Sequence, residues 1–221
     1  MKKLLKIIGK KKREKLVSTL DEFIRQTKLN EDLNPNESRK NLEESLIELI
    51  YYDGQHSSSG LLFTNNGYFL TAKHCIKNPK ELRARLYDGK NYKIKKVCAV
   101  SHKSDIGLAK IKISGNYEIK KFRIHNTNKL EKIPIVLLIR KDGQIKEKYG
   151  IIDRDWNPGS LDALNQFSSS IISKAGDSGG IIISPDGKLI GIHYGNRPNN
   201  SSHIKIIRAL ELIEFYKNQN L

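Results

Sequence analysis

The chain has 221 residues and a formal net charge of +16 at pH 7, and 38% of its residues are hydrophobic while 29% are charged. No run of about 18 apolar residues occurs, which excludes an ordinary membrane-spanning helix. The two cysteines lack neighbouring ligand pairs, so the sequence favours neither a disulfide framework nor a zinc site, and we expect no cofactor. These values are typical of one globular domain with an appendage.

Residues 1–45 are predicted to be that appendage, a basic helical extension that precedes a main domain over residues 46–221. Apolar residues from Leu16 to Thr27 recur at helical spacing, and residues 2–28 hold ten Lys or Arg against three acids. Such a positive field attracts nucleic acid, an anionic surface or an acidic protein. The same charges also suit a solvated helix face without a partner, and no nucleic-acid motif selects between these alternatives.

A second, short helix is predicted after a break at residues 34–36. Asn36 or Ser38 is expected to cap this helix, which then runs through Leu42 and Leu46.

The first eight residues superficially resemble a secretory signal. Lys6 interrupts their apolar run, and no small-residue cleavage site follows. We therefore expect a cytoplasmic protein, and the sequence does not predict its oligomeric state.

Turn signals divide the main domain into short strands, as in a β-barrel or a β-sandwich. Asn-Gly and Asp-Gly pairs begin at residues 66, 88, 142 and 186. Strands are predicted over the β-branched runs 92–100, 133–139 and 179–183. The last of these strands is expected to form a hairpin with residues 189–192, and apolar residues at helical spacing predict a closing helix over 206–216.

Three short motifs carry the chemistry of the main domain. Residues 71–75 read TAKHC, residues 104–111 read SDIGLAKI, and residues 176–180 read GDSGG. A serine hydroxyl is a weak nucleophile near neutral pH, so it needs a base such as imidazole, and imidazole in turn needs a carboxylate to orient it. Taken separately, each motif also fits an unremarkable role: a packing histidine, a turn-forming aspartate or a glycine loop.

Together and in this order, the motifs resemble those of the chymotrypsin-like, or trypsin-fold, serine proteases. The resemblance covers roughly residues 46–215 and implies a mainly β fold, a double six-stranded antiparallel β-barrel with a C-terminal helix. It also implies that His74 is the general base, Asp105 its partner and Ser178 the nucleophile. The backbone N–H groups of Gly176 and Ser178 would then form the oxyanion hole.

The run over residues 191–199 is similar to that of the glutamyl endopeptidases, a subgroup of this family. The resemblance implies that Ser173 and His193 recognise the P1 side chain, and that Tyr194 and Gly195 pair with the substrate backbone. A hydroxyl and an imidazole can hydrogen-bond a carboxylate or a carboxamide. We therefore expect cleavage after Glu, with Gln as the alternative, or else a His193 that merely packs beneath the triad.

The sequence departs from the family at several positions. Ser59 stands where secreted members have the cysteine that pairs with the equivalent of Cys75, so that bridge cannot form. His203 replaces a glycine that is usual in the subgroup. Asp177 is the residue that pairs with a freed amino terminus in trypsin-type enzymes, but no matching amino terminus is encoded. Another cation must neutralise its carboxylate, unless the chain is cut at a site such as residues 39–40.

These features leave three hypotheses about function. The first is a serine endopeptidase that acts on protein or peptide substrates through an acyl-enzyme. The second is a catalytically silent protease fold that binds partners through its basic extension. The third is a protease whose main substrate is its own chain.

Overall fold

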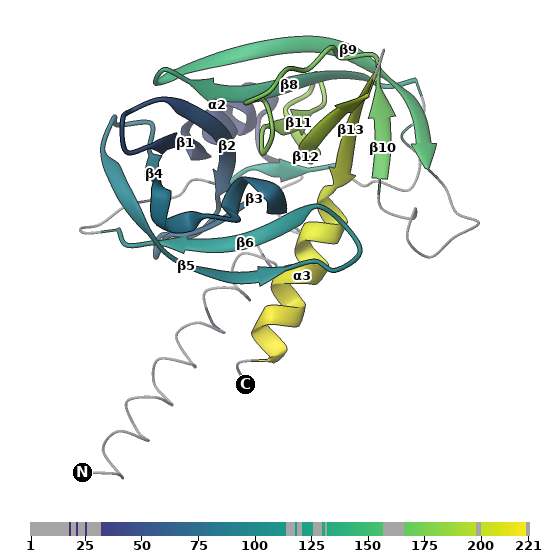
Figure 1. The fold of residues 1–221 in the computed structure, drawn as a ribbon. Helices are drawn as coiled ribbons and strands as arrows, with labels where there is room; N and C mark the ends of the chain where they lie inside the picture. Colours follow the sequence, from purple (N-terminus) through teal and green to yellow (C-terminus); the bar gives the residue numbers. More distant parts are fainter. Residues whose placement is uncertain are drawn as a thin grey trace, which may run out of the picture.

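Figure 1 shows the fold in a computed structural model, which describes residues 32–113, 118, 121–125, 130, 132–156, 166–197 and 200–219, together with residues 18, 21 and 25. The helix predicted over residues 16–27 lies almost wholly outside the described residues. The described part is mainly β, and it confirms the predicted chymotrypsin-like double barrel with a C-terminal helix.

Six antiparallel strands close the first barrel in the order β1-β2-β3-β6-β5-β4. Their bounds are β1 Leu46–Tyr51, β2 His56–Leu62, β3 Tyr68–Ala72, β4 Leu82–Arg85, β5 Asn91–Val100 and β6 Ile106–Ile111. Strands β3 and β6 are almost entirely buried, whereas exposed residues recur along β5. The barrel therefore has one packed interior and a solvated wall.

The second barrel has the order β11-β8-β9-β10-β13-β12 and closes through pairing of β11 with β12. Its strands are β8 Pro134–Lys141, β9 Gln144–Trp156, β10 Gln166–Ser169, β11 Ile181–Ile183, β12 Lys188–Arg197 and β13 Asn200–Lys205. A two-residue strand, β7 (Arg123–Ile124), adds to β12 in parallel outside this ring. One hydrophobic cluster joins both barrels to both helices, so the barrels share a core.

The predicted turns have the backbone conformations that their residues favour. Asp142 and Gly143 both have positive φ (55° and 75°), which is the type I′ geometry of a two-residue hairpin between β8 and β9. The predicted hairpin of β11 and β12 is also present, with Ile181 opposite Ile192. Local turn chemistry therefore sets the register of these strands.

Two helices flank the barrels. The predicted closing helix is confirmed as α3 (Ile206–Asn218), which packs its apolar face into the shared core. Helix α2 (Pro35–Ser45) is capped by the Asn34 side chain, which accepts a hydrogen bond from the N–H of Asn36 (2.9 Å). The predicted cap at Asn36 or Ser38 is therefore wrong.

The helix begins earlier than expected because proline is favourable at the first helical position, where no N–H donor is needed. Within the described residues, neither helix combines the length and the apolar character needed to cross a membrane.

Helix α2 docks on the second barrel through polar contacts. The Ser38 hydroxyl donates to the carbonyl oxygen of Gly187 (2.7 Å) and accepts from the N–H of Arg123 (2.9 Å). Arg140 on β8 donates to the carbonyl oxygens of Glu43 and Leu46 (2.6 Å each). The end of the predicted extension is thus packed against the barrels, while the predicted boundary at residue 45 stays a prediction.

Candidate active site

The fold brings His74 and Asp105 together at one end of the first barrel. His74 lies in a 3₁₀ turn (Lys73–Ile76) directly after β3, and Asp105 directly precedes β6. Because β3 and β6 pair with Ala72 opposite Ile106, Lys73 lies beside Asp105 and donates its N–H to Asp105 O (3.2 Å), and His74 follows directly. The His74 Nδ1 atom lies 2.5 Å from Asp105 Oδ2, and the backbone N–H of His74 donates to Asp105 Oδ1 (3.0 Å).

This pairing shifts the ionisation of both residues. The hydrogen bonds to Asp105 and then to Cys75 raise the pKa of His74 well above its ordinary value of 6.5. Burial alone would raise the pKa of Asp105, but the hydrogen bond and the charge of His74 outweigh burial and lower it. Asp105 is therefore an ionised carboxylate that fixes the imidazole tautomer with its proton on Nδ1 and leaves Nε2 available.

Ser178 lies on the loop between β10 and β11 and lines the same cavity as His74. The cavity has a volume of about 390 Å³, and its lining also includes Gly176, Tyr51, Lys77 and Glu81. The Ser178 hydroxyl donates to the carbonyl oxygen of Tyr194 (3.5 Å). In this conformation the hydroxyl is thus paired with Tyr194 and not with His74, although both residues line one cavity.

The nucleophile loop adopts a backbone that depends on its glycines. Gly176 and Gly179 have φ of +93° and +78°, and a Cβ atom on Gly179 would lie 1.9 Å from the carbonyl oxygen of Ser59. Backbone hydrogen bonds from Ser59 N–H to Ser178 O (2.9 Å) and from Gly179 N–H to His193 O (2.8 Å) tie the loop to both barrels. The position of Ser178 is therefore set by tertiary contacts.

The two predicted oxyanion donors remain available in this loop. The N–H of Asp177 donates to Lys174 O (3.0 Å), so the turn uses that group internally. Among the described residues, no acceptor is recorded for the N–H groups of Gly176 and Ser178. Their role as oxyanion donors stays a prediction.

Lys148 on β9 neutralises Asp177. Its Nζ atom lies 2.5 Å from Asp177 Oδ2, and it also donates to the carbonyl oxygen of Ile172 (3.2 Å). The N–H of Lys174 adds a further hydrogen bond to the carboxylate (2.6 Å), which is nearly buried. Of the two alternatives left by the sequence, the structure provides the internal cation.

The predicted specificity residues lie deeper than the cavity at Ser178. Ser173 is 6% exposed and accepts a hydrogen bond from the Ser201 hydroxyl (2.8 Å), and His193 is 1% exposed. Its Nδ1 atom lies 3.3 Å from Nδ1 of His203, and burial lowers the pKa of His193 to about 4. His193 is therefore a neutral imidazole near pH 7, and neither it nor Ser173 lines the cavity that holds Ser178.

The strand expected beside the substrate is β12. The Tyr194 hydroxyl donates to Gln166 Oε1 (2.9 Å), and the backbone carbonyl oxygen of Tyr194 accepts from the Ser178 hydroxyl. Gly195 is half-buried. Both cysteines are free thiols, with Cys75 buried beside His74. Across the described ranges, no three His, Cys, Asp or Glu side chains converge as a metal ion would require.

Sequence analysis missed Glu48 and His56 of the first barrel, of which His56 contacts the nucleophile loop and Glu48 contacts His56. Glu48 is fully buried in β1, and His56 begins β2. Their only sequence signals are a charged residue inside an apolar strand and a histidine next to a serine run. His56 meets the loop 120 positions away in sequence, so no local pattern could reveal the contact.

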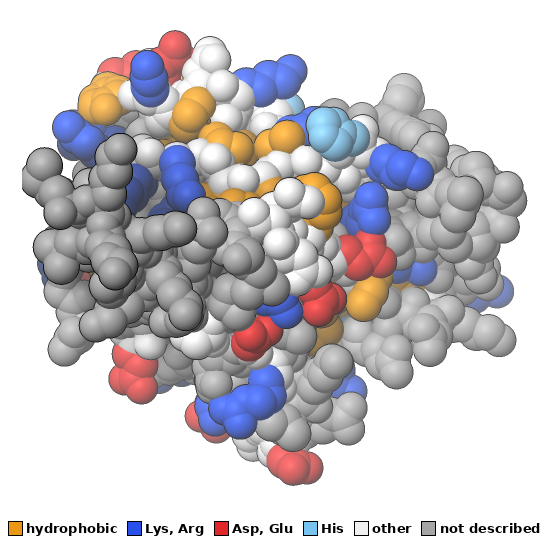
Figure 2. All heavy atoms as spheres, turned by 90° about the horizontal axis from the view of Figure 1, so that it is seen from below, with side chains coloured by type: hydrophobic (Ala, Val, Ile, Leu, Met, Phe, Trp, Pro, Cys, Tyr) orange, Lys and Arg blue, Asp and Glu red, His pale blue; other side chains and the backbone are white. Residues whose placement is uncertain are grey.

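The basic side chains that the structure describes do not form one patch on the face seen in Figure 2. Lys and Arg side chains lie scattered there among acidic and hydrophobic ones. The predicted attraction of the N-terminal segment to an anionic partner concerns residues outside the described ones, and it stays a prediction.

Comparison with known proteins finds a family that matches most of the region forming the two barrels. Residues 58–192 match the family described as Trypsin-like peptidase domain. Two curated relatives are similar to this chain: serine protease HTRA1 from Xenopus laevis and from Xenopus tropicalis, each 26% identical over 144 residues, or 62% of this chain and 31% of the relative. The chain thus spans about a third of the length of these relatives.

Proposed function

Because the chain belongs to the trypsin-like peptidase domain family, we propose that it is a serine endopeptidase with His74, Asp105 and Ser178 as its catalytic triad. The observation that supports the proposal is the shared cavity, which His74 and Ser178 both line, together with the contact of His74 Nδ1 with Asp105. Around Ser178, the N–H groups of Gly176 and Ser178 can donate hydrogen bonds to an anion. This combination serves acyl transfer and has no evident purpose in a purely structural loop.

The reaction would begin with a rotation of the Ser178 hydroxyl from Tyr194 O toward Nε2 of His74. His74 then takes the hydroxyl proton while Ser178 Oγ attacks the carbonyl carbon of the scissile bond. Asp105 stabilises the imidazolium that forms, because its carboxylate already accepts the Nδ1 proton. The same imidazolium returns a proton to the leaving amine, and water later hydrolyses the acyl-enzyme by the reverse sequence.

The negative charge of the tetrahedral intermediate would be held by the N–H groups of Gly176 and Ser178. Lys148 supports this arrangement, because its ammonium group stabilises Asp177 between the two donors. Preorganised donors of this kind stabilise the transition state more than the ground state.

For specificity we propose a P1 glutamate, or a glutamine, held by Ser173 and His193. Support comes from their chemistry: a buried hydroxyl and a neutral imidazole can both donate to a carboxylate or carboxamide. Ile172, at the position where trypsin-type enzymes have an aspartate, offers no partner to a basic side chain. The neutral His193–His203 pair would gain charge-assisted hydrogen bonds when an acidic side chain enters.

A positional-scanning library of fluorogenic peptides tests this specificity. We expect the highest kcat/KM for Glu at P1, and His193→Ala should remove the preference for Glu over Ala. A wild-type preference for Lys, Arg or large aromatic residues would contradict the assignment.

Catalysis itself is tested with a fluorophosphonate probe on purified full-length chain. We expect labelling of Ser178 that is abolished in Ser178→Ala and reduced at least about a hundredfold in His74→Ala. Intact-mass measurement of wild type beside Ser178→Ala would at the same time reveal any cleavage of the chain by itself.

The second candidate is a silent protease fold that binds partners, and the orientation of the Ser178 hydroxyl favours it. In this conformation the hydroxyl donates its hydrogen bond to Tyr194 O and not to His74. A folded chain whose Ser178 never reacts with the probe would support this candidate over the endopeptidase.

A further inference from the structure

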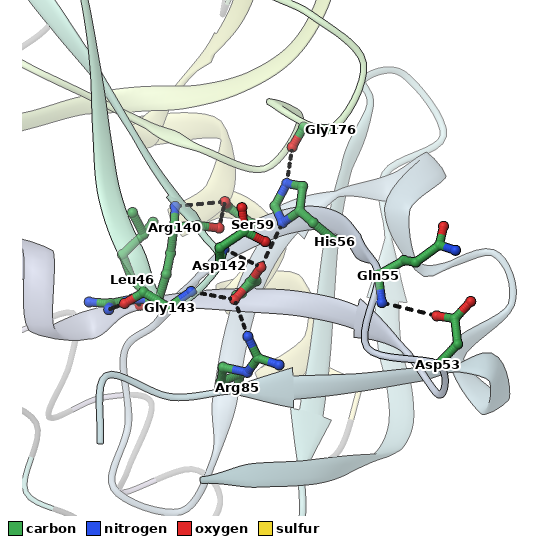
Figure 3. Close-up of polar contacts among 11 residues, drawn as sticks. Leu46, Asp53, Gln55, His56, Ser59, Arg85, Arg140, Asp142, Gly143 and Gly176 are labelled. Atoms are coloured by element: carbon green, nitrogen blue, oxygen red, sulfur yellow. Dashed lines mark hydrogen bonds and ion pairs between the residues drawn. The ribbon is translucent and has the colours of Figure 1, made fainter. Parts of the chain in front are cut away.

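A buried carboxylate links the first barrel to the turn between β8 and β9. Glu48 on β1 is 0% exposed, and it accepts from the N–H groups of Asp142 (2.8 Å) and Gly143 (3.1 Å) and from Arg85 (3.2 Å). The fourth partner of this carboxylate is His56, whose Nδ1 lies 3.0 Å from Glu48 Oε1. Figure 3 labels the four partners of Glu48, which are His56, Arg85, Asp142 and Gly143.

The same imidazole also contacts the nucleophile loop. His56 Nε2 lies 2.9 Å from the carbonyl oxygen of Gly176, a contact that Figure 3 marks with a dashed line, while Nδ1 contacts the Glu48 carboxylate. Both neighbours, a carboxylate and a carbonyl, can only accept hydrogen bonds. Both ring nitrogens must therefore donate, which makes His56 an imidazolium ion paired with Glu48.

This contact restricts the backbone of Gly176, a residue type that has unusual conformational freedom. Gly176 has φ of +93°, and its α-carbon lies against the ring, since a Cβ atom there would be 3.0 Å from His56 Cδ2. Glycine has many accessible backbone conformations, so an unrestrained Gly176 could rotate its peptide groups freely. A fixed Gly176 carbonyl restricts ψ of this residue and thereby the direction of the next N–H groups along the loop.

We propose that His56, held by Glu48, is a positioning residue that keeps Gly176 in the conformation able to bind an oxyanion. The proposal rests on the function proposed above. The loop is then ordered before the substrate arrives. Folding itself orients the N–H donors of Gly176 and Ser178, so no further loss of conformational entropy is needed when an oxyanion forms.

Two substitutions at His56 separate its contact with the Gly176 carbonyl from its contact with the Glu48 carboxylate. In His56→Gln the amide nitrogen replaces Nε2, so it can donate to Gly176 but not reach Glu48 as well. In His56→Asn the shorter amide replaces Nδ1, so it can donate to Glu48 but not reach Gly176. Both variants keep a polar side chain at this buried position, which limits the loss of stability.

We expect kcat of His56→Asn to fall at least about tenfold with KM within about twofold, while His56→Gln stays within a few-fold of wild type. Affinity for a peptidyl trifluoromethyl ketone, which forms an oxyanion in the site, should fall in parallel with kcat. A His56→Asn variant with wild-type kcat, or a His56→Gln variant that is the more impaired of the two, would overturn the proposal.

A readout independent of catalysis separates this proposal from the proposed function. If wild-type Ser178 is unreactive toward the fluorophosphonate, the endopeptidase assignment fails. Crystal structures of Ser178→Ala with and without His56→Asn still test the hold on Gly176. A rotated Gly176 carbonyl in the double variant supports the positioning role, and an unchanged loop overturns it.

Discussion

His74 is the residue whose ionisation should govern the rate of the proposed reaction. The base must be neutral to accept a proton, and its hydrogen bond to Asp105 raises its pKa above 6.5. Activity should therefore rise with pH through a limb whose midpoint lies above 6.5. The pH dependence of kcat/KM measures this midpoint in the free enzyme.

Asp105→Asn is the matched control for that prediction. It removes the charge that favours the imidazolium, so the limb should move to lower pH while the maximal rate falls by orders of magnitude. A wild-type limb at or below pH 6.5 would contradict the pairing of His74 with an ionised Asp105.

Lys148 is the second residue whose removal has a defined consequence. Lys148→Met leaves the nearly buried Asp177 carboxylate with one backbone donor, and we expect a loss of about 3 kcal/mol in the free energy of unfolding. Lys148→Arg should retain most of the stability, and Asp177→Asn combined with Lys148→Met should recover part of it. Denaturant unfolding measures these values, and equal stability of Lys148→Met and wild type would contradict the pairing.

At the level of elements, helix α2 depends on its cap. Asn34→Ala removes the acceptor for the N–H of Asn36 and should cost about 1 kcal/mol. For a chain of this size, such a loss lowers the melting temperature by roughly 2–4 °C. Asn34→Ser should keep the stability of the wild type, because serine is also a good N-cap. The Asn36 side chain does not cap the helix, so Asn36→Ala should change the stability little. A larger effect at Asn36 than at Asn34 would disprove this cap.

Element prediction succeeded where the signal is local. The Asp142–Gly143 turn, the β11–β12 hairpin and α3 follow from residues within a few positions of one another. Strand β2 was harder to predict, since Ser58 and Ser59 are buried polar residues in a strand that lacks alternating hydrophobicity. Contacts distant in sequence satisfy Ser59, whose hydroxyl accepts from the N–H of Arg140 on β8 (3.1 Å) and whose N–H donates to Ser178 O (2.9 Å), whereas the Ser58 hydroxyl has no hydrogen-bond partner in the part of the chain that the structure describes.

The candidate site also has a part that local motifs predict and a part that only tertiary contacts reveal. The motifs around His74, Asp105 and Ser178 predicted which residues gather, and their catalytic roles stay predictions until Ser178 is shown to react. Lys148 and His56 could not be identified, because each meets the loop through contacts with residues far away in sequence. The prediction of a trypsin-like serine peptidase is confirmed at the level of the family, whereas similarity to the glutamyl endopeptidases stays a prediction.

At the scale of the whole molecule, the site lies between two barrels that polar contacts hold together. Arg140 joins α2 to β8, and Glu48 joins β1 to the β8–β9 turn. The loop geometry at Ser178 therefore depends on the docking of both barrels. Cleavage at residues 39–40 would disturb this arrangement, because α2 is held on both sides of that point: Ser38 donates to Gly187 O (2.7 Å), and Arg140 donates to Glu43 O (2.6 Å).

We therefore expect the intact chain to be active without a cut at residues 39–40. A variant with Arg39→Gln and Lys40→Gln cannot be cut there by a protease that requires a basic residue. Its fluorophosphonate labelling rate should stay within about twofold of wild type, since exposed ion pairs such as those of Arg39 contribute less than about 1 kcal/mol. Intact-mass spectrometry during labelling provides the decisive measurement: if only a shortened chain reacts, then Lys148 alone does not order the loop and an activation cut is needed.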